Sequence, residues 1–498
     1  MSVEKEDCQE IRIQENTNLL AIGAVPRLLT VVLGQDLVDS CKAGENITIV
    51  GRIITRWRPC KSGQRPELEH CLVANNVLIA NQSVAAIRQQ TTEWSNRFWA
   101  KHKNCPFEGR DLLTKSFCSQ IYGLHLVKLA ILLTIIAGCD DNGEGNKVVD
   151  VVGGGARKHR REGHLLLVGD PGTAKSQFLV AAAKLSPRSV MTTGSGSTSA
   201  GLTVAAVKEA GSWQLEAGAL VLADGGICCI DEFNALRPHD RTAIHEAMEQ
   251  QTLSVAKAGL VCMLSTRCSI IGACNAKGAF EEGEPMSANV ALASPLLSRF
   301  DLILVMQDRR SAEWDHELST AILSNATVTR SGTSTPIIDL AQLRAYLIMV
   351  RHSCSPTMSV EARVVLGKYY QLQRRADIRD AARTTIRLLE SLIRLAQAHA
   401  KLMHNARVEI SDAIWAIVLM ETSLATQSLL PKRPDLYAAA PEDPVQQYNE
   451  YEDLILKKLE INPKIFQTLG ENENMMINVG IDKDADRILC SWATSPNQ

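Results

Sequence analysis

The sequence lacks the cysteine spacing of a metal-binding or disulfide framework. Its 14 cysteines are scattered singly, apart from the pair Cys228–Cys229, and no two of them form a C-x-x-C motif. This pattern argues against a zinc ribbon and favours a reducing compartment. A strong charge imbalance is also missing, because the formal net charge is −2. Any nucleic-acid binding must therefore come from local basic patches.

Long apolar segments are missing as well. The first residues, MSVEKEDCQEIRIQENTN, contain no apolar signal segment. The longest apolar run, LVKLAILLTIIAG at 126–138, contains Lys128 and is too short to span a bilayer. We therefore expect a buried helix there and no membrane partner. The chain also has no internal repeat with a period of roughly 20–50 residues.

The arrangement of apolar runs predicts an α/β protein. Alternating runs between residues 28 and 80 predict a small antiparallel β unit, a fragment of a barrel. Between 164 and 305, buried runs end in polar loops and alternate with helical segments, which predicts a parallel sheet covered on both faces. Residues 338–425 have a helical pattern. The basic run RKHRR at 157–161 is either a nuclear-import or DNA-binding patch or part of a solvated linker.

The stretch HLLLVGDPGTAKSQFLVAAAKL at 164–185 has the order of a phosphate-binding loop: a buried strand, a Gly/Pro loop and a helix. Backbone N–H groups and a helix N-terminus then converge on an anion. In this arrangement Lys175 reaches the β- and γ-phosphates, and Ser176 binds Mg²⁺. Ala174 replaces the second glycine of the pattern, which we expect to be tolerable if its φ is negative. The predicted nucleotide-binding residues are Gly169, Asp170, Pro171, Gly172, Thr173, Ala174, Lys175 and Ser176.

Polar residues follow two further buried strands. Asp231 and Glu232 follow the apolar residues of GGICCIDEF, and a buried strand that ends in two acids is costly unless the acids meet a metal ion or a reaction. We assign Asp231 to Mg²⁺ and Glu232 to the base that orients the attacking water. An acidic helix cap would explain either acid alone. Asn275 ends a third strand, where ligands bind parallel sheets, although it is also a common turn residue.

Two basic residues have possible roles outside this cluster. The segment TLSVAKAGLVCMLST at 252–266 predicts a β-hairpin with Lys257 near its tip, either exposed to solvent or bound to a partner. Arg299 directly precedes the strand FDLILVM. It is either a structural residue, in an ion pair with an acid such as Asp301, or a residue that projects into the site of a neighbouring subunit.

Together GDPGTAKSQFL, CCIDEF, AIHEAMEQQTLSVAKAGLV and SPLLSRFDLILV resemble the minichromosome maintenance (MCM) family, hexameric AAA+ ATPases that unwind DNA. The resemblance implies that an alanine before Lys175 is a common form of the loop. It places Asn275 at the first sensor, Arg299 at the arginine finger and Arg387, within ARTTIRLLESLIRLAQAHAKL, at the second sensor. Residues 192–224 are similar to the family's insert in the second ATPase helix.

The resemblance also implies a domain order: an AAA+ P-loop ATPase core with a parallel sheet and helical lid, preceded by a partial OB-fold β domain. The boundaries that we expect are 1–85 for the partial OB-fold, 86–163 for a helical connector and basic linker, 164–330 for the core, 331–428 for the lid and 429–498 for a linker and tail. The family's N-terminal helical and zinc modules precede the region where this chain starts, which fits a truncated gene model, an isoform or a fragment.

A further departure concerns the first sensor. The family's N-P-x-G reads NAKG here, and Ala276 in place of proline is expected to relax the turn that presents Asn275.

The resemblance implies an ATP-dependent DNA helicase or translocase that uses ATP and Mg²⁺. Hydrolysis would occur between the subunits of a homo- or hetero-hexamer, with Arg299 and Arg387 contributed by the neighbour and Lys257 gripping single-stranded DNA. Several segments look most like the ninth paralogue, whose branch acts with the eighth-paralogue MCM protein in recombination repair, in the nucleus and on chromosomes. Two alternatives remain: a weakly or non-hydrolysing assembly subunit of a mixed ring, and a protein-remodelling AAA+ machine.

Overall fold

The computed structural model describes most of the chain. The described residues are 6–15, 27–41, 47–57, 68–79, 84–137, 160–196, 199–209, 212–257, 260–278, 286–290, 292–308, 311–328, 338–353, 355–375, 384–423, 430, 434–441 and 443–461.

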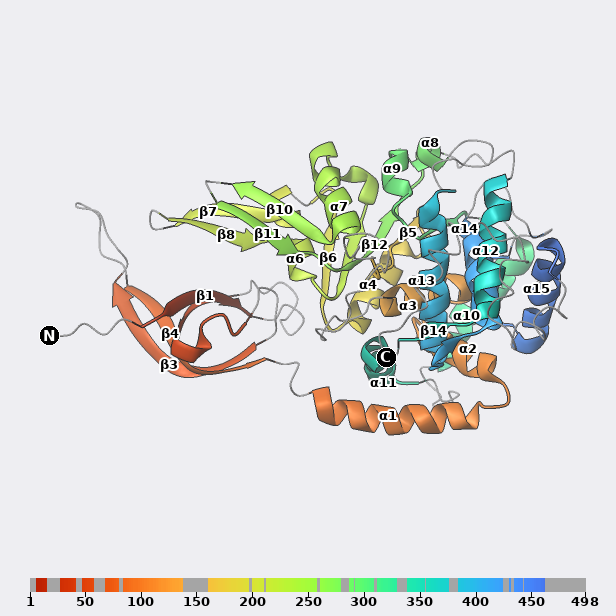
Figure 1. Ribbon diagram of the computed structural model, residues 1–498, viewed down its shortest axis with the longest axis horizontal. Coiled ribbons are helices and arrows are strands. Elements are labelled where there is room, and N and C mark those ends of the chain that lie inside the picture. The colour runs from red at the N-terminus through yellow and green to blue at the C-terminus, as the bar shows by residue number, and fades with distance from the viewer. Residues whose placement is uncertain are drawn as a thin grey trace.

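The N-terminal part is a four-stranded sheet with the order β1-β2-β4-β3. Its strands are β1 (Cys8–Gln14), β2 (Leu28–Gly34), β3 (Ile47–Trp57) and β4 (Leu68–Ile79), with a 3-10 turn at Gln35–Leu37. The predicted β unit is present, but it is not purely antiparallel, because β2 and β4 pair in parallel. The long β3 strand pairs antiparallel with β4, so that β4 runs in the same direction as β2. Figure 1 shows this sheet at one end of the molecule.

Three helices connect this sheet to the core: α1 (Val84–Lys101), α2 (Pro106–Ser116) and α3 (His125–Ile136). Every residue of α3 is buried, as the apolar run predicts. Lys128 lies among these apolar side chains, and its Nζ donates a hydrogen bond to the backbone oxygen of Ile121 at 2.7 Å. Burial lowers the pKa of Lys128 to about 8. Among the described residues, no helix is long and apolar enough to cross a membrane.

The core contains a five-stranded parallel sheet with the order β13-β5-β12-β9-β6. Its strands are β5 (Leu165–Gly169), β6 (Ser189–Thr193), β9 (Ile227–Asp231), β12 (Ser269–Cys274) and β13 (Leu302–Met306). Successive residues of β5 enter different apolar clusters: Leu165 and Leu167 join one, and Leu166 and Val168 join the other. Both faces of the sheet are therefore covered, which confirms the prediction and explains why its strands are continuously apolar.

Short helices and two β-hairpins surround this sheet. These elements are α4 (Lys175–Leu185), α5 (Ser199–Leu202), β7 (Val204–Glu209), β8 (Ser212–Ala217), α6 (Ala219–Leu222), a 3-10 turn at Phe233–Ala235, α7 (Pro238–Gln250), β10 (Thr252–Lys257), β11 (Leu260–Ser265), α8 (Met286–Val290) and α9 (Ser294–Leu297). The hairpins β7–β8 and β10–β11 extend from the core toward the end that carries β1–β4 (Figure 1). An ion pair of 3.3 Å joins Arg12 of β1 to Glu216 of β8.

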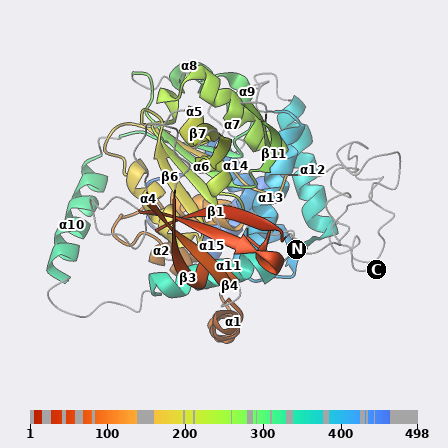
Figure 2. The ribbon, with the colours of Figure 1, turned by 90° about the vertical axis from the view of Figure 1, so that its left-hand side faces the viewer.

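The C-terminal part is mainly helical, as the sequence predicts for 338–425. Its elements are α10 (Ala312–Val328), α11 (Leu340–Ser353), β14 (Thr357–Met358), α12 (Val360–Arg375), α13 (Ile386–Leu402), β15 (Arg407–Val408), α14 (Ile410–Ser423) and α15 (Pro444–Lys458). Viewed from the end that carries β1–β4, α10 stands out on one side of the molecule (Figure 2). The helices α13 and α14 contribute to the larger apolar cluster, which joins this part to the core.

Candidate nucleotide-binding site

The predicted phosphate-binding loop lies between a buried strand and a helix. The strand β5 ends at Gly169, and α4 begins at Lys175. The Nζ of Lys175 donates hydrogen bonds to the backbone oxygens of Gly169 at 2.9 Å and Asp170 at 2.5 Å, and to Oγ1 of Thr173 at 3.1 Å. Burial lowers the pKa of Lys175 from its ordinary value. The lysine thus lies directly on the loop, with exposed Ser176 beside it at the helix N-terminus.

Ala174 corrects one expectation from the sequence. Its φ is +63° and its ψ is 14°, so it adopts the left-handed conformation and not a negative φ. The reason is local: the loop reverses here so that α4 starts at the next residue, and Ala174 already accepts the helix bond from Phe178 N at 3.1 Å. A left-handed residue with a Cβ costs about 1–2 kcal/mol. Gly172, at φ +87°, adopts a positive φ without that cost.

The two predicted acids lie at the end of β9. Asp231 is its last residue, and Oδ1 of Asp231 accepts a hydrogen bond from Glu232 N at 2.9 Å. Glu232 has φ +50°, which turns the chain out of the strand. Its carboxylate accepts a hydrogen bond of 2.6 Å from Oγ of Ser195. Sequence reasoning missed Ser195, because its place beside Glu232 depends on the pairing of β6 with β9, where Thr193 lies opposite Asp231.

Asn275 lies between the loop and the acids. It directly follows β12, which pairs with β5 on one side and with β9 on the other. The backbone oxygen of Asn275 accepts a hydrogen bond of 3.5 Å from Nδ2 of Asn234. The turn that contains Ala276 is also held by a bond of 2.8 Å from Lys277 N to the backbone oxygen of Asn289. Hydrogen bonds therefore hold the turn on both sides of Ala276, and the effect of Ala276 on the presentation of Asn275 stays a prediction.

The strand order therefore brings three separate sequence motifs to one edge of the sheet. The strands β5, β12 and β9 are neighbours, and each is followed at its carboxyl end by a predicted site residue. Lys175, Asn275 and the pair Asp231–Glu232 meet at this edge, where open parallel sheets bind ligands. The backbone of the loop, Lys175 and the Ser176 hydroxyl at a helix N-terminus suit a nucleoside triphosphate. The carboxylate of Asp231 and the hydroxyl of Ser176 suit Mg²⁺.

The two predicted arginines lie elsewhere. Arg299 precedes β13, whose Leu302 pairs with Leu165 and whose Met306 pairs with Gly169. Arg299 is therefore at the amino edge of the sheet, while the loop follows the carboxyl edge. Four strand steps of about 3.3 Å separate these edges by about 13 Å. The structure does not bring Arg299 into the nucleotide site of its own chain.

Arg299 and Arg387 instead meet on one acid that sequence reasoning missed. Glu249, near the end of α7, pairs through Oε2 with Nη2 of Arg299 and through Oε1 with Nη2 of Arg387, the latter at 2.6 Å. Nη1 of Arg299 also donates to the backbone oxygen of Pro295 at 2.6 Å. Nη1 of Arg387 donates to Oγ of Ser298 at 2.9 Å. The core and the first turn of α13 are thereby joined around a single carboxylate.

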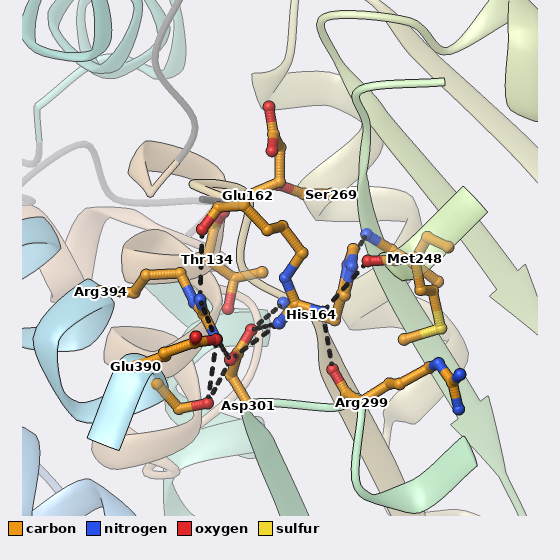
Figure 3. A network of polar contacts seen from close by, with 12 residues as sticks. Thr134, Glu162, His164, Met248, Ser269, Arg299, Asp301, Glu390 and Arg394 are labelled. Carbon is orange, nitrogen blue, oxygen red and sulfur yellow. Dashed lines mark hydrogen bonds and ion pairs between the residues drawn. The ribbon is translucent and has the colours of Figure 1, made fainter. Parts of the chain in front are cut away.

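Asp301 is not the partner of Arg299. Figure 3 shows the Arg299 side chain pointing away from Asp301, which lies among buried polar groups. Asp301 accepts two bonds of 3.0 Å from Nη2 of Arg160, one of 2.6 Å from Nη2 of Arg394 and one of 2.7 Å from His164 N. Burial alone would raise the pKa of Asp301, but the charges of Arg394 and Arg160 hold it well below its usual range.

This network also corrects the interpretation of RKHRR. Arg160 belongs to that run, yet its side chain is only 13% exposed and pairs with Asp301. Burial lowers its pKa to about 10. Arg160 is therefore part of the core, in neither a solvated linker nor a nucleic-acid patch, and residues 157–159 lie outside the described residues.

Lys257 is the last residue of β10, opposite Leu260 in the register of the hairpin. The predicted hairpin is therefore present, and Lys257 is next to its turn. The side chain of Lys257 lies outside the described residues. A second hairpin, β7–β8, is formed by part of the segment 192–224, and the sequence did not predict its strands.

The parallel sheet, the loop between β5 and α4 and the helical lid define an AAA+ P-loop ATPase fold. The chain matches the MCM OB domain over residues 2–56, the MCM P-loop domain over 105–326 and the MCM AAA-lid domain over 341–424. The chain belongs to the MCM family.

Individual relatives support this assignment. The chain is 50% identical over 434 residues to "Probable DNA helicase MCM9" of Oryza sativa subsp. indica, covering 86% of this chain and 63% of the relative. It is 47% identical over 452 residues to the protein of the same name in Arabidopsis thaliana, covering 90% and 68%. It is 38% identical over 427 residues to "Minichromosome maintenance protein MCM" of Saccharolobus solfataricus, covering 84% and 59%. The chain thus spans about two thirds of the length of these relatives.

Proposed function

We propose that this protein is an ATP-dependent DNA helicase or translocase that works within an MCM-type assembly. The observation that carries the proposal is the convergence of Lys175, Asp231, Glu232 and Asn275 at the carboxyl edge of one parallel sheet. These residues lie at or after the carboxyl ends of three strands that are far apart in sequence. The relatives named as probable DNA helicases support the same conclusion.

Each residue of the site has a chemical role in this proposal. The loop from Gly169 to Ser176 binds the phosphates through its backbone N–H groups, and the Nζ of Lys175 exchanges its bonds to the loop oxygens for bonds to phosphate oxygens. Ser176 and Asp231 would hold Mg²⁺, which would supply neutralisation of phosphate charge when ATP is bound. Glu232 orients the attacking water and accepts its proton.

Two further contacts complete the site. Oγ of Ser195 donates to the Glu232 carboxylate and thereby fixes its direction. Asn275 directly follows the neighbouring strand β12, and we assign its side chain to contact the γ-phosphate or the attacking water.

The arginines support a site that is shared between subunits. Arg299 is at the opposite edge of the sheet from its own loop, so it suits contact with the nucleotide of a neighbour, together with Arg387. Arginines placed in this way stabilise the charge that develops on the transferred phosphoryl group. We therefore infer that the active form is a ring, a homo- or hetero-hexamer as the family resemblance implies.

DNA binding is assigned to the hairpins of the core. Both hairpins project in the same direction, and Lys257 stands next to the turn of β10–β11. In a ring these hairpins would line a central channel, where Lys257 contacts the phosphates of single-stranded DNA. Because the net charge is only −2, such local contacts have to supply the electrostatic affinity.

The similarity to the two plant proteins leads us to propose a role in homologous-recombination repair, in the nucleus and on chromosomes, with the eighth-paralogue MCM protein as partner.

We also keep the domain boundaries as a proposal. They are 1–85 for the partial OB-fold, 86–163 for the connector, 164–330 for the ATPase core, 331–428 for the lid and 429–498 for the linker and tail.

The experiment is a combined hydrolysis and unwinding assay, with and without the eighth-paralogue protein. We expect ATP hydrolysis that increases with single-stranded DNA, and strand separation that requires ATP. Binding of ATP without hydrolysis in a single turnover would favour the alternative of a non-hydrolysing assembly subunit. Hydrolysis that responds to an unfolded polypeptide but not to DNA would instead indicate a protein-remodelling machine.

A further inference from the structure

Glu249 has an unusual position, because a single carboxylate receives both arginines that the proposed function assigns to a neighbouring nucleotide. Each oxygen takes one guanidinium group: Oε2 pairs with Arg299, and Oε1 pairs with Arg387 at 2.6 Å. The arginines come from different parts of the chain, one from the turn after α9 and the other from the first turn of α13. Glu249 is their common contact.

The charges explain why an acid is needed there. Two guanidinium groups that converge on one place repel each other, and a carboxylate between them converts that repulsion into two attractions. Burial alone would raise the pKa of Glu249, but the hydrogen bond from Arg299 and the charge of Arg387 lower it. The carboxylate is therefore ionised at neutral pH and holds the two side chains together.

The backbone below this contact is fixed independently. Nη1 of Arg160 donates to the backbone oxygens of Met248 and Arg299, each at 3.2 Å, while its Nη2 is bound by Asp301. Met248 precedes Glu249, so one buried guanidinium holds both segments that carry the acid and the arginine (Figure 3). The backbone segments that carry Glu249 and Arg299 are thus held together by the hydrogen bonds of Arg160. This arrangement suits a residue that positions the arginines permanently better than one that restrains them and must release them.

The arginines also keep donors for a second partner. A guanidinium group has five N–H donors. Glu249 takes one N–H from Nη2 of each arginine, while Nη1 of Arg299 donates to Pro295 and Nη1 of Arg387 to Ser298, so each of these nitrogens keeps one further N–H. The side chains of Arg299, Arg387 and Glu249 are 14%, 33% and 47% exposed, so the cluster borders the surface, with Arg387 and Glu249 the more accessible of the three to another subunit. An exposed acid in such a place contributes little to the stability of the fold.

We propose that Glu249 is a positioning residue that presents Arg299 and Arg387 as a preformed pair to the γ-phosphate of nucleotide bound by the neighbouring subunit. This inference rests on the proposed function, because it requires hydrolysis at a shared site. Glu249 of α7 fixes the geometry of Arg299 and Arg387 before the neighbouring subunit binds ATP.

The first test is Glu249→Gln, which preserves the shape but turns one oxygen into an N–H donor facing an arginine. We expect kcat for ATP hydrolysis to fall about 10- to 100-fold, as a displacement of about 1 Å can cause, while KM for ATP and the melting temperature stay close to wild type. The matched control is Glu93→Gln, which removes the acid of another exposed Arg–Glu pair, with Arg97 in α1. That control should hydrolyse ATP at the wild-type rate.

The decisive test places the same substitution on either side of one interface. In mixed assemblies, Lys175→Ala subunits have intact arginines but no functional nucleotide site, and Arg299→Ala subunits have an intact nucleotide site but no functional finger. Only an interface between the two kinds of subunit can hydrolyse ATP. Glu249→Gln added to the Lys175→Ala subunits should lower the activity of the mixture by the same 10- to 100-fold. Added to the Arg299→Ala subunits, it should change nothing, which a general structural role would not predict.

The outcomes separate this inference from the proposed function. If Arg299→Ala abolishes hydrolysis while Glu249→Gln has no effect in either subunit, the shared site stands and the role of Glu249 is overturned. An increased rate in Glu249→Gln would also overturn it, because the carboxylate would then restrain the arginines. If Arg299→Ala hydrolyses ATP like wild type, the shared site itself is wrong.

Discussion

Substitution of Asp301 by asparagine tests the buried network beneath the arginines. The Asp301 side chain is 3% exposed and is bound by Arg160 at 3.0 Å and Arg394 at 2.6 Å. An asparagine side chain would keep the shape but remove the buried counter-charge that Arg160 and Arg394 share, leaving the longer pair of Arg394 with Glu390 at 3.7 Å. Removal of one partner of a buried ion pair costs about 3–5 kcal/mol. Since domains unfold with about 5–15 kcal/mol, we expect Asp301→Asn to remove a large part of the stability of the core.

The assay measures the free energy of unfolding by urea titration at several pH values, with a spectroscopic signal that reports on the core. The pKa of Asp301 in the folded protein is far below its ordinary value, so its contribution is fully present above about pH 4 and is lost as the pH falls below that value. The difference between wild type and Asp301→Asn should therefore be large at pH 7 and shrink toward pH 2. The control Asp453→Asn, on the exposed face of α15, should change stability by less than about 0.5 kcal/mol. A loss below about 1 kcal/mol at pH 7 for Asp301→Asn would refute this reasoning.

Three further predictions concern the loop, the hairpin and the shared site. Ala174→Gly removes the Cβ from a left-handed residue, and the greater freedom of glycine in the unfolded chain offsets part of that gain. We expect a net stabilisation of about 1 kcal/mol in thermal unfolding. A loss of stability would contradict the loop geometry. Lys257→Ala should weaken single-stranded DNA binding for all sequences alike and lower the salt slope of log K by roughly 0.7, and an unchanged slope in an assembled ring would remove Lys257 from the channel. Arg299→Ala should slow hydrolysis about 10³- to 10⁵-fold, with partial recovery on mixing with Lys175→Ala subunits, and full activity of Arg299→Ala alone would rule out a finger.

The sequence predicted the parts of the site that depend on local order. Lys175, Asp231 and Asn275 each follow a continuous apolar run, and a buried strand that ends in a polar residue can be recognised without knowing its neighbours. The parallel sheet then brings these residues together, as expected. The same reasoning identified the buried helix around Lys128, because the run was too short for a membrane and too apolar for the surface.

Other features depend on contacts between distant segments and were missed or wrongly predicted. Arg160 was interpreted from its basic neighbours, but its conformation is set by Asp301, which follows it by 141 residues. Ser195 and Glu249 lie in segments that resemble the family, but neither residue was given a role there, and only the strand order and the end of α7 place them beside functional side chains. The conformation of Ala174 is set by the start of α4, which outweighs the preference of alanine for negative φ.

The most direct test of the central claim is ATP hydrolysis by Glu232→Gln in the presence of single-stranded DNA. The account predicts that this variant binds ATP almost as well as wild type while its hydrolysis rate falls by orders of magnitude, because an amide cannot accept the proton of the attacking water. Lys175→Ala, measured beside it, should lose ATP binding itself. Hydrolysis by Glu232→Gln at the wild-type rate would contradict the assignment of this edge of the sheet as the catalytic site.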